Sequence, residues 1–400
     1  MAVAGIVAEY NVFHRGHAWQ LRELRRRLGP DTAVVVCMSG NFVQRGDFAI
    51  APKHARAEMA LAGGADLVLE LPTPWSTAGA EQFARGGAAV LAATGVVTHL
   101  AFGCECGDLE PLQRVAAHVD SGLYHTEVRR FLKLGMTFAA ARQAALSGPA
   151  LAGAAAVCLA RPNNALAVEY LRSLAALGST IAPMALPRVG ADHDSQAPGE
   201  YLSASAVRSR LLAGDSWRFA VPESTAAVLA REMAAGRAPV SVLACERAVL
   251  SRLRAMPEEA FAVYDGGGEG LYRRVYRAVH TAATLEEVLH GAKTRRYPLA
   301  RLRRMLLHSY LDVRTPGKGE TPPYLRVLGA SVAGRALLKT MRETAALPVL
   351  TKPGHIRRLG PAAQSLFALE SRCTDLYTLA YPALDQALPG SEYTTNPVVL

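Results

Sequence analysis

Apolar residues in the first half of the chain form short runs that alternate with longer stretches of mixed apolar and polar residues. Short runs rich in β-branched residues are typical of strands that are buried on both faces of a parallel sheet. Stretches in which apolar residues recur every three or four positions predict amphipathic helices. The expected strands span residues 2–9, 32–40, 65–72, 97–103 and 179–188, and the main expected helices span residues 17–28, 53–64, 81–95, 164–178 and 202–214.

This alternation predicts an α/β fold in which residues 1–222 form a doubly wound, Rossmann-like parallel sheet. Residues 108–178 are expected to be helical. Beyond residue 222 the pattern is mostly helical, with loops expected at 266–270 and 314–323. We therefore expect a second, mostly α-helical domain over residues 223–400. Ligands of such a fold bind at the carboxyl ends of the parallel strands.

Composition excludes several classes of protein. No uncharged apolar run reaches eighteen residues, so the sequence predicts no transmembrane span. The first apolar stretch contains Glu9 and has no basic patch before it, which argues against a signal peptide. Six scattered cysteines include no CxxC pair, so we expect no zinc site and a reducing, cytoplasmic location, and the sequence singles out no residue as a metal ligand.

The net charge of +10 is unevenly distributed. Residues 1–230 hold 20 Lys and Arg against 19 Asp and Glu, whereas residues 231–400 hold 24 against 15. A basic region beside a neutral one indicates that an anionic macromolecule binds the second half, although a solvated basic surface is the simpler alternative.

The segment HRGH, with His14 and His17 on either side of Gly16, follows the first expected strand and begins the first expected helix. Free N–H groups at a helix N-terminus bind anions, and glycine lets the backbone approach a phosphate closely. Imidazole donors can stabilise charge that moves during phosphoryl chemistry. The segment therefore predicts a phosphate site, the alternative being two ordinary histidines in a turn.

Later segments offer further groups at the same edge of the sheet. LSASAVR supplies Ser203, Ser205 and Arg208, which suit a triphosphate, although helix capping alone also explains the serines. RPNN places Asn163 and Asn164 at a helix start, where one amide is expected to face the nucleotide. Arg188 ends the last expected strand of the first domain, at the ligand-binding edge.

Two further polar stretches are candidates for the second substrate or for nucleic acid. The segment 39–61 follows the second strand and carries Asn41, Gln44, Arg45, Lys53 and Arg56. The segment 293–304 has no acidic residue, and its apolar spacing predicts a helix with Leu302, Met305 and Leu306 on its buried face. Its candidate phosphate contacts and its candidate stacking residue are Lys293, Arg295, Arg296, Tyr297, Arg301, Arg303 and Arg304. A solvated polar surface is the alternative for both stretches.

Taken together, these segments resemble the bacterial tRNA(Met) cytidine acetate ligase family of the HxGH nucleotidyltransferase-like superfamily. HxGH identifies only the superfamily, whereas SGNFVQRG, RPNN and KTRRY are more specific. The resembling segments, in family order, are GIVAEYNVFHRGH, SGNFVQRGDFAIAPKHARAEMAL, GGADLVLELP, AFGCECGD, RPNNALAVEYL, LPRVGADHDS, LSASAVR and KTRRYPLARLRRMLLH.

The resemblance implies an ATP-dependent ligase that activates acetate as acetyl-adenylate and acetylates the wobble cytidine of elongator tRNA(Met). It implies catalytic roles for His14, His17 and Arg208, and a Mg²⁺ ion that bridges the leaving phosphates. The residues it implies for ATP binding, together with the serines above, are Ile6, Val7, Ala8, Glu9, Tyr10, Asn11, Val12, Phe13, His14, Arg15, Gly16, His17, Ala18, Trp19, Gly103, Asn163 and Arg188.

The chain departs from the family pattern at three places. Val12 stands where the family usually has proline, and Ala204 with Ser205 replaces a pattern that usually contains threonine. The segment 191–195 lacks a tyrosine that is common just before its histidine. These departures affect the roles of nearby side chains more than the resemblance itself.

Three other functions are compatible with parts of the sequence. A small-molecule adenylyltransferase of the same superfamily would share HxGH but would not need a basic helical domain. A tRNA-binding protein without catalysis would not need both histidines, Arg208 and the two asparagines. A class I aminoacyl-tRNA synthetase would carry a KMSKS-like lysine loop, which this sequence lacks.

Overall fold

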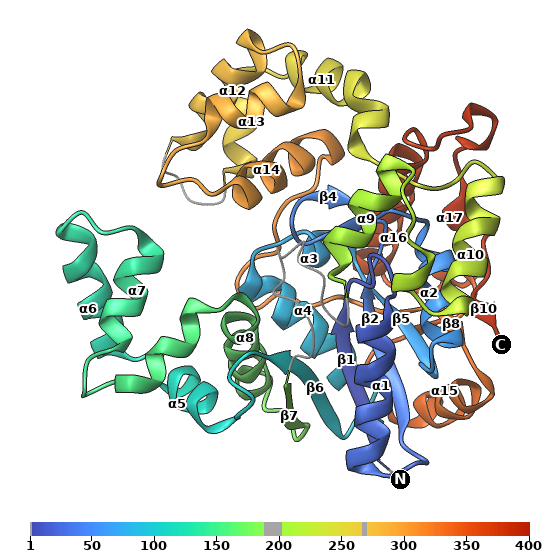
Figure 1. Cartoon of the computed structure of the whole chain (residues 1–400), viewed down its shortest axis with the longest axis horizontal. Helices are drawn as coiled ribbons and strands as arrows, with labels where there is room; N and C mark the ends of the chain where they lie inside the picture. Colours follow the sequence, from blue (N-terminus) through green and yellow to red (C-terminus); the bar gives the residue numbers. More distant parts are fainter. Residues whose placement is uncertain (1, 188–201, 266–269) are drawn as a thin grey trace.

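One mostly parallel sheet organises the protein, and the computed structural model describes residues 2–187, 202–265 and 270–400 (Figure 1). Its main path has the strand order β10-β8-β5-β2-β1-β6-β7, and β9 (Val349–Leu350) pairs with β8 beside this path. The five strands from the N-terminal half are mutually parallel, which confirms the predicted sheet. The strands of the main path are β1 (Val3–Ala8), β2 (Ala33–Ser39), β5 (Leu67–Leu71), β6 (His99–Cys104), β7 (Ala182–Pro187), β8 (Leu325–Ala330) and β10 (Val398–Val399).

Strand β2 shows why the central runs are uniformly apolar. Successive side chains of a strand point to opposite faces. Val35 and Cys37 pack in one core cluster, whereas Val34, Val36 and Met38 pack in another. Both faces of the sheet are therefore covered, as a parallel sheet requires.

Helices cover the two faces in separate groups. Helices that contribute to the first cluster include α4 (Ala80–Ala93), α5 (Glu110–His118), α8 (Pro162–Ala176), α15 (Val332–Thr344) and α16 (Pro361–Thr378). Helices that contribute to the second are α1 (Arg15–Leu28), α2 (Lys53–Ala62), α9 (Ala204–Ala213) and α10 (Glu223–Ala234). The loop after β1 and the carboxyl ends of β6 and β7 are left to form a site at this edge of the sheet.

Two helical regions extend beyond the sheet (Figure 1). The first continues from α5 through α6 (Gly122–Lys133) and α7 (Phe138–Leu146), close to the predicted positions. The second, here called the upper lobe, spans residues 241–313. Its core, including Val275 and Leu302, continues into residues outside the lobe such as Phe48 and Tyr377. Its α-helices are α11 (Glu246–Arg254), α12 (Leu271–Thr281), α13 (Leu285–Ala292) and α14 (Leu299–Leu311).

The chain then returns to the sheet, which corrects the predicted boundary at residue 222. Strand β8 pairs antiparallel with β5, and β10 pairs with β8, so residues 223–400 do not form one separate helical domain. The six-residue strand was missed because Arg326 interrupts its apolar pattern. That arginine is buried beside Glu392, a partner that local sequence does not reveal. Among the described residues, no helix combines the length and apolarity needed to span a membrane.

Candidate active site

The HRGH segment forms the junction between β1 and α1. His14 is the N-cap of α1, and its Nδ1 accepts the N–H of Gly16 at 3.1 Å. The N–H of His14 in turn donates to Nδ1 of His17 at 3.2 Å. The two rings stack with centroids 3.7 Å apart. Because both Nδ1 atoms accept hydrogen bonds, each neutral ring carries its proton on Nε2, the form that donates to a phosphate.

Helix α9 supplies the second part of the site. The hydroxyl of Ser203 caps the helix by accepting the N–H of Ala206 at 3.2 Å, and it lies 2.9 Å from the hydroxyl of Ser205. Arg208 donates to the carbonyl of Asn11, which joins α9 to the loop after β1. Burial lowers the pKa of Arg208, while the Glu9 carboxylate opposes that effect. An arginine nevertheless keeps its charge at neutral pH, so this end of the site is cationic.

These groups line one cavity of about 420 Å³, here called the main cavity. Its volume lies within the range of ordinary ligand pockets. Both serines and Arg208 line it as predicted. Of the seventeen residues outside LSASAVR that were predicted to bind ATP, twelve also line it: Ile6, Val7, Ala8, Glu9, Tyr10, Asn11, His14, Gly16, His17, Trp19, Gly103 and Asn163.

Four of the other five predicted ATP residues, all in the described part of the chain, do not line this wall. Val12, Phe13 and Ala18 pack in the core, and the Asn11–Val12 peptide bond is cis. The guanidinium of Arg15 donates to the carbonyl of Phe219 at 2.7 Å. Arg188, together with the 191–195 segment, lies outside the described residues. The prediction that the Val12, Phe13 and Ala18 side chains contact ATP directly is therefore wrong. These side chains support the site from the core.

The opposite side of the main cavity is apolar, and sequence patterns did not single it out. Its side chains come from α4, β6, α8 and β7, where they look like ordinary core residues. The sequence held one signal for this side of the cavity. Leu166 and Tyr170 are four residues apart on α8, a spacing that places both side chains on the same face of the helix. The apolar lining residues include Phe83, Phe102, Leu166, Tyr170 and Leu186. An apolar wall facing a cationic end suits a ligand with a flat ring and a phosphate tail.

Tyr10 lines the same cavity with a buried hydroxyl. Within residues 2–187, 202–265 and 270–400, no group forms a hydrogen bond with that hydroxyl. Burial raises the pKa of Tyr10, so the hydroxyl keeps its proton. A buried polar atom without a partner is unusual, and a bound ligand would satisfy it.

Comparison with known proteins identifies the family. The family described as HIGH Nucleotidyl Transferase matches residues 1–390. The tRNA(Met) cytidine acetate ligase of Syntrophomonas wolfei is 36% identical over 417 residues, covering 100% of this chain and 99% of that protein. The chain belongs to the tRNA(Met) cytidine acetate ligase family. The ligase of Acetivibrio thermocellus is 34% identical, with 100% of both chains covered.

Solved structures of the ligase family have the same fold. Thermotoga maritima TmcAL in its apo form aligns with a TM-score of 0.95 at 33% identity, covering 100% of both chains. The same protein bound with alpha-thio ATP aligns with a TM-score of 0.92 over 100% of both chains. The resemblance found in the sequence is thereby confirmed.

The two asparagines of RPNN hold the loop after β6 in this member of the ligase family. Oδ1 of Asn164 accepts the N–H groups of Glu105 and Cys106 at 2.8 and 3.3 Å. Nδ2 of Asn163 donates to the Glu105 carboxylate at 2.5 Å. Asn163 lines the main cavity, whereas Asn164 is buried behind the wall. Contact between the Asn163 amide and a nucleotide stays a prediction.

Five residues of segment 39–61 were predicted to contact the second substrate or tRNA. Asn41 is buried, so its predicted contact is wrong, and the other four divide into two pairs. Gln44 and Arg45 line the main cavity. Lys53 and Arg56 are only 2% and 0% exposed, so their predicted contact with tRNA is wrong. Arg56 instead donates to backbone carbonyls, including that of Ser39 at 2.9 Å.

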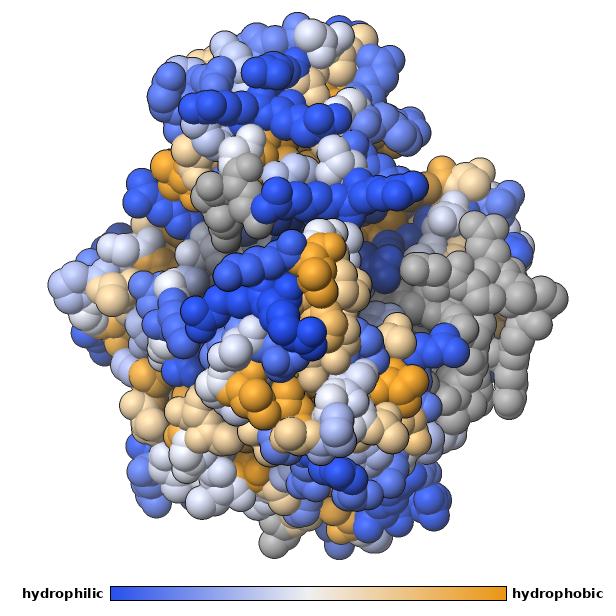
Figure 2. Space-filling view, turned by 90° about the vertical axis from the view of Figure 1, so that its left-hand side faces the viewer, coloured by the Kyte–Doolittle hydropathy of each residue, from blue (hydrophilic) through white to orange (hydrophobic). Residues whose placement is uncertain are grey.

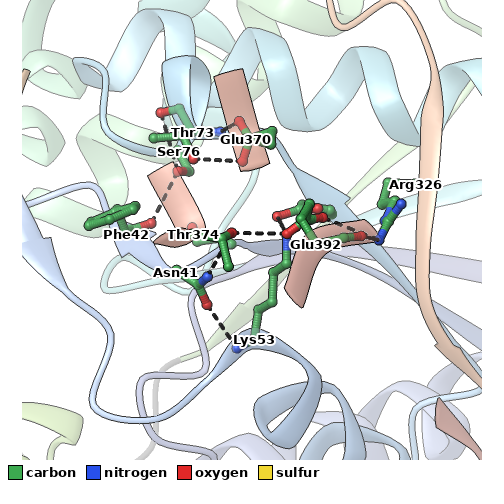
Figure 3. A network of polar contacts seen from close by, with 12 residues as sticks. Asn41, Phe42, Lys53, Thr73, Ser76, Arg326, Glu370, Thr374 and Glu392 are labelled. Atoms are coloured by element: carbon green, nitrogen blue, oxygen red, sulfur yellow. Dashed lines mark hydrogen bonds and ion pairs between the residues drawn. The ribbon is translucent and has the colours of Figure 1, made fainter. Parts of the chain in front are cut away.

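Lys53 belongs to a buried polar network (Figure 3). Its Nζ lies 2.7 Å from carboxylate oxygens of Glu70 and Glu392. Burial alone would lower the pKa of Lys53, but the two carboxylates outweigh it and raise that pKa. The side chain of Asn41 joins the network. Its Oδ1 accepts the backbone N–H of Lys53 at 3.0 Å, and its Nδ2 donates to the hydroxyl of Thr374 at 3.2 Å. The network thus fixes the start of the segment that carries Gln44 and Arg45.

The basic segment 293–304 is a loop followed by a helix. Lys293, Arg295 and Arg296 are exposed in the loop between α13 and α14, where a continuous helix had been expected. Leu302, Met305 and Leu306 are buried as predicted. Tyr297 is only 8% exposed, so its predicted role as a stacking platform is wrong. The loop forms because Pro298 favours an extended residue before it and begins α14.

The remaining arginines of this segment differ in their contacts. Arg303 is exposed and lines the main cavity. Arg304 is partly buried, and its guanidinium donates to the carbonyl of Gln44 at 3.5 Å. Arg301 lies 3.4 Å from the carboxylate of Asp265. The exposed loop and Arg303 are the parts of the segment best placed for an anionic partner.

Proposed function

We propose that this chain is an ATP-dependent acetate ligase that acetylates the exocyclic amine of the wobble cytidine in elongator tRNA(Met). The observation that carries the proposal is the convergence of His14, His17, Ser203 and Arg208 on one cavity with an apolar wall. Family membership supports the same activity.

In the first step, a carboxylate oxygen of acetate attacks the α-phosphorus of ATP. A new P–O bond forms, the bond from the α-phosphorus to the bridging oxygen breaks, and pyrophosphate leaves with the bonding electrons. His14, His17 and Arg208 would stabilise the charge that develops on the phosphate oxygens. The Tyr10 hydroxyl and the serines would orient the nucleotide.

In the second step, the cytidine amine attacks the acetyl carbon and the bond from that carbon to the adenylate oxygen breaks. The amine loses one proton and AMP leaves with the bonding electrons. The exposed loop that contains Lys293, Arg295 and Arg296 would contact the tRNA backbone. Gln44, Arg45 and Arg303 would lie between this surface and the nucleotide.

Magnesium would associate with the nucleotide phosphates. Two carboxylates line the main cavity, Glu9 and Asp47, and each already accepts a backbone N–H at 2.8 Å. Across the described ranges, no group of three or more His, Cys, Asp or Glu side chains could hold a metal. This donor set fits a Mg²⁺ ion held mainly by phosphate oxygens and water. Such an ion would neutralise charge on the leaving pyrophosphate.

The six cysteines, all in described parts of the chain, are free thiols. Free thiols are typical of a reducing compartment, which supports a cytoplasmic location.

The test is to incubate the protein with ATP and labelled acetate, with and without tRNA(Met). We expect acetyl-adenylate without tRNA and N-acetylcytidine in the tRNA when it is present. ATP binding without either product would contradict the proposal. Transfer of an adenylyl group to a small molecule would instead support the adenylyltransferase alternative.

A further inference from the structure

A short hairpin separates the main cavity from a second cavity. Its strands are β3 (Phe42–Val43) and β4 (Asp47–Phe48), and the N–H of Gly46 closes the turn by donating to Val43 at 2.9 Å. A Cβ atom placed on Gly46 would lie 2.4 Å from the backbone nitrogen of Arg304. The turn therefore packs directly against α14, in a contact that requires glycine.

The second cavity, of about 320 Å³, lies between this hairpin and the upper lobe. Most of its wall is apolar, with Phe48, Leu285, Leu289, Leu306 and Tyr310 among the lining side chains. Asp47 and Arg303 line both cavities, so the two spaces share a polar boundary. In Figure 2 the upper lobe joins the rest of the molecule through a narrower waist, and hydrophilic residues cover much of the surface there.

We propose that the second cavity binds the unstacked cytosine base of the tRNA, an inference that rests on the proposed function. An enzyme that modifies a base must take it out of its stack, and apolar pockets with a few polar groups receive such bases. The cytosine amine must reach the acetyl group in the main cavity. A base in the second cavity can place its amine at the boundary formed by Asp47 and Arg303, where the amine can reach the acetyl group. The exposed cations of the loop before α14 belong to the same lobe that forms most of the pocket wall, where they can hold the tRNA backbone.

The two boundary residues suit cytosine better than uracil. Cytosine presents an amine donor beside a ring-nitrogen acceptor and a carbonyl acceptor. The Asp47 carboxylate can accept from the amine, and the Arg303 guanidinium can donate to an acceptor. Uracil places a carbonyl where cytosine has its amine, which would face the carboxylate unfavourably.

The test fills the second cavity with Leu289→Trp while leaving the main cavity unchanged. We expect acetate-dependent ATP–pyrophosphate exchange to stay within about twofold of wild type, because Leu289 does not line the main cavity. We expect kcat/KM for tRNA acetylation to fall about 100-fold, the scale of a misplaced substrate. Val263→Trp is the matched control, since Val263 is 49% exposed in the same lobe but does not line the cavity.

Leu243→Trp provides a second variant at an exposed position of the cavity wall, where folding is less sensitive. Free cytidine should also inhibit tRNA acetylation at least about fivefold better than uridine. Normal tRNA acetylation by folded Leu289→Trp and Leu243→Trp proteins would overturn the cytosine pocket. Absence of both exchange and acetylation in wild type would instead overturn the proposed function.

Discussion

The ammonium group of Lys53 lies 2.7 Å from the carboxylate of Glu392, a residue 339 positions later in the chain. Both side chains are nearly inaccessible to solvent, and Arg326 lies 3.2 Å from the same carboxylate group. Burial would raise the pKa of Glu392, but the two cations overcome it and lower that pKa to about 2. The ion pair therefore joins the beginning of α2 to the last part of the fold.

Removing one member of this pair should destabilise the protein strongly. Glu392→Gln would leave two buried cations, Lys53 and Arg326, with Glu70 as the carboxylate still paired to Lys53. We expect a loss of about 3–5 kcal/mol in the free energy of unfolding. Urea titration at pH 7.5 measures it. Glu127→Gln is the control, because Glu127 pairs with Arg130 on an exposed helix and should cost less than about 1 kcal/mol. Equal losses in the two variants would contradict the role of burial.

Acid should destabilise the protein partly through His308. Burial lowers the pKa of His308 from 6.5 to about 4, and Arg304 acts in the same direction. The imidazole of His308 binds a proton more tightly in the unfolded chain than in the folded protein. The stability that the neutral, buried His308 contributes is therefore present above pH 6.5 and is lost as the pH falls toward 4. Between pH 7.5 and 5, His308→Gln should lose about 2 kcal/mol less stability than wild type. An identical loss in both proteins would exclude His308.

His17 should be needed for adenylate formation. His17→Ala removes a phosphate donor, and His17→Asn removes the ring while keeping an acceptor for the His14 N–H. We expect both to slow acetate-dependent ATP–pyrophosphate exchange about 10²–10³-fold, with tRNA binding largely retained. His125→Ala, at an exposed position on α6, is the control. Wild-type exchange in His17→Asn would show that only the helix cap matters.

The loop before α14 should contribute to tRNA affinity. Changing Arg295 and Arg296 together to Ala should weaken tRNA binding. The slope of log K against log salt concentration should become shallower by about 1–2, because each phosphate contact contributes about 0.9 to that slope. Exchange without tRNA should be unaffected. The matched control is a double change to Ala at Arg357 and Arg358, two exposed arginines that are consecutive in the sequence and lie outside this loop. An unchanged salt slope in the loop variant would mean that tRNA binds elsewhere.

Gly46 should be sensitive for two separable reasons. Its φ of +75° disfavours other residues, and a side chain would collide with α14. Gly214 has the same φ of +75° but has nothing within 4 Å of an added Cβ, so Gly214→Ala measures the conformational cost alone. We expect Gly46→Ala to lose about 1–3 kcal/mol more than Gly214→Ala, by the cost of overpacking. Denaturant unfolding of both variants tests this difference, and equal losses would contradict the collision.

The sequence predicted the features that depend on local pattern. The apolar run of β2 and the position of HRGH after β1 were sufficient for the sheet and for one end of its ligand site. Partners distant in the chain were not predictable. Lys53 looked like a surface cation because its partner Glu392 is 339 residues away. Tyr297 looked available for stacking because nothing local showed that the upper lobe buries it.

The placement of β8 beside β5 has a consequence for synthesis on the ribosome. Strand β5 ends at Leu71, but its antiparallel neighbour ends only at Ala330. The nascent chain must therefore carry an unpaired sheet edge while most of the protein is translated. Such edges can pair with other chains and cause aggregation. Completion of the sheet belongs to a late stage of folding, after the upper lobe has been made.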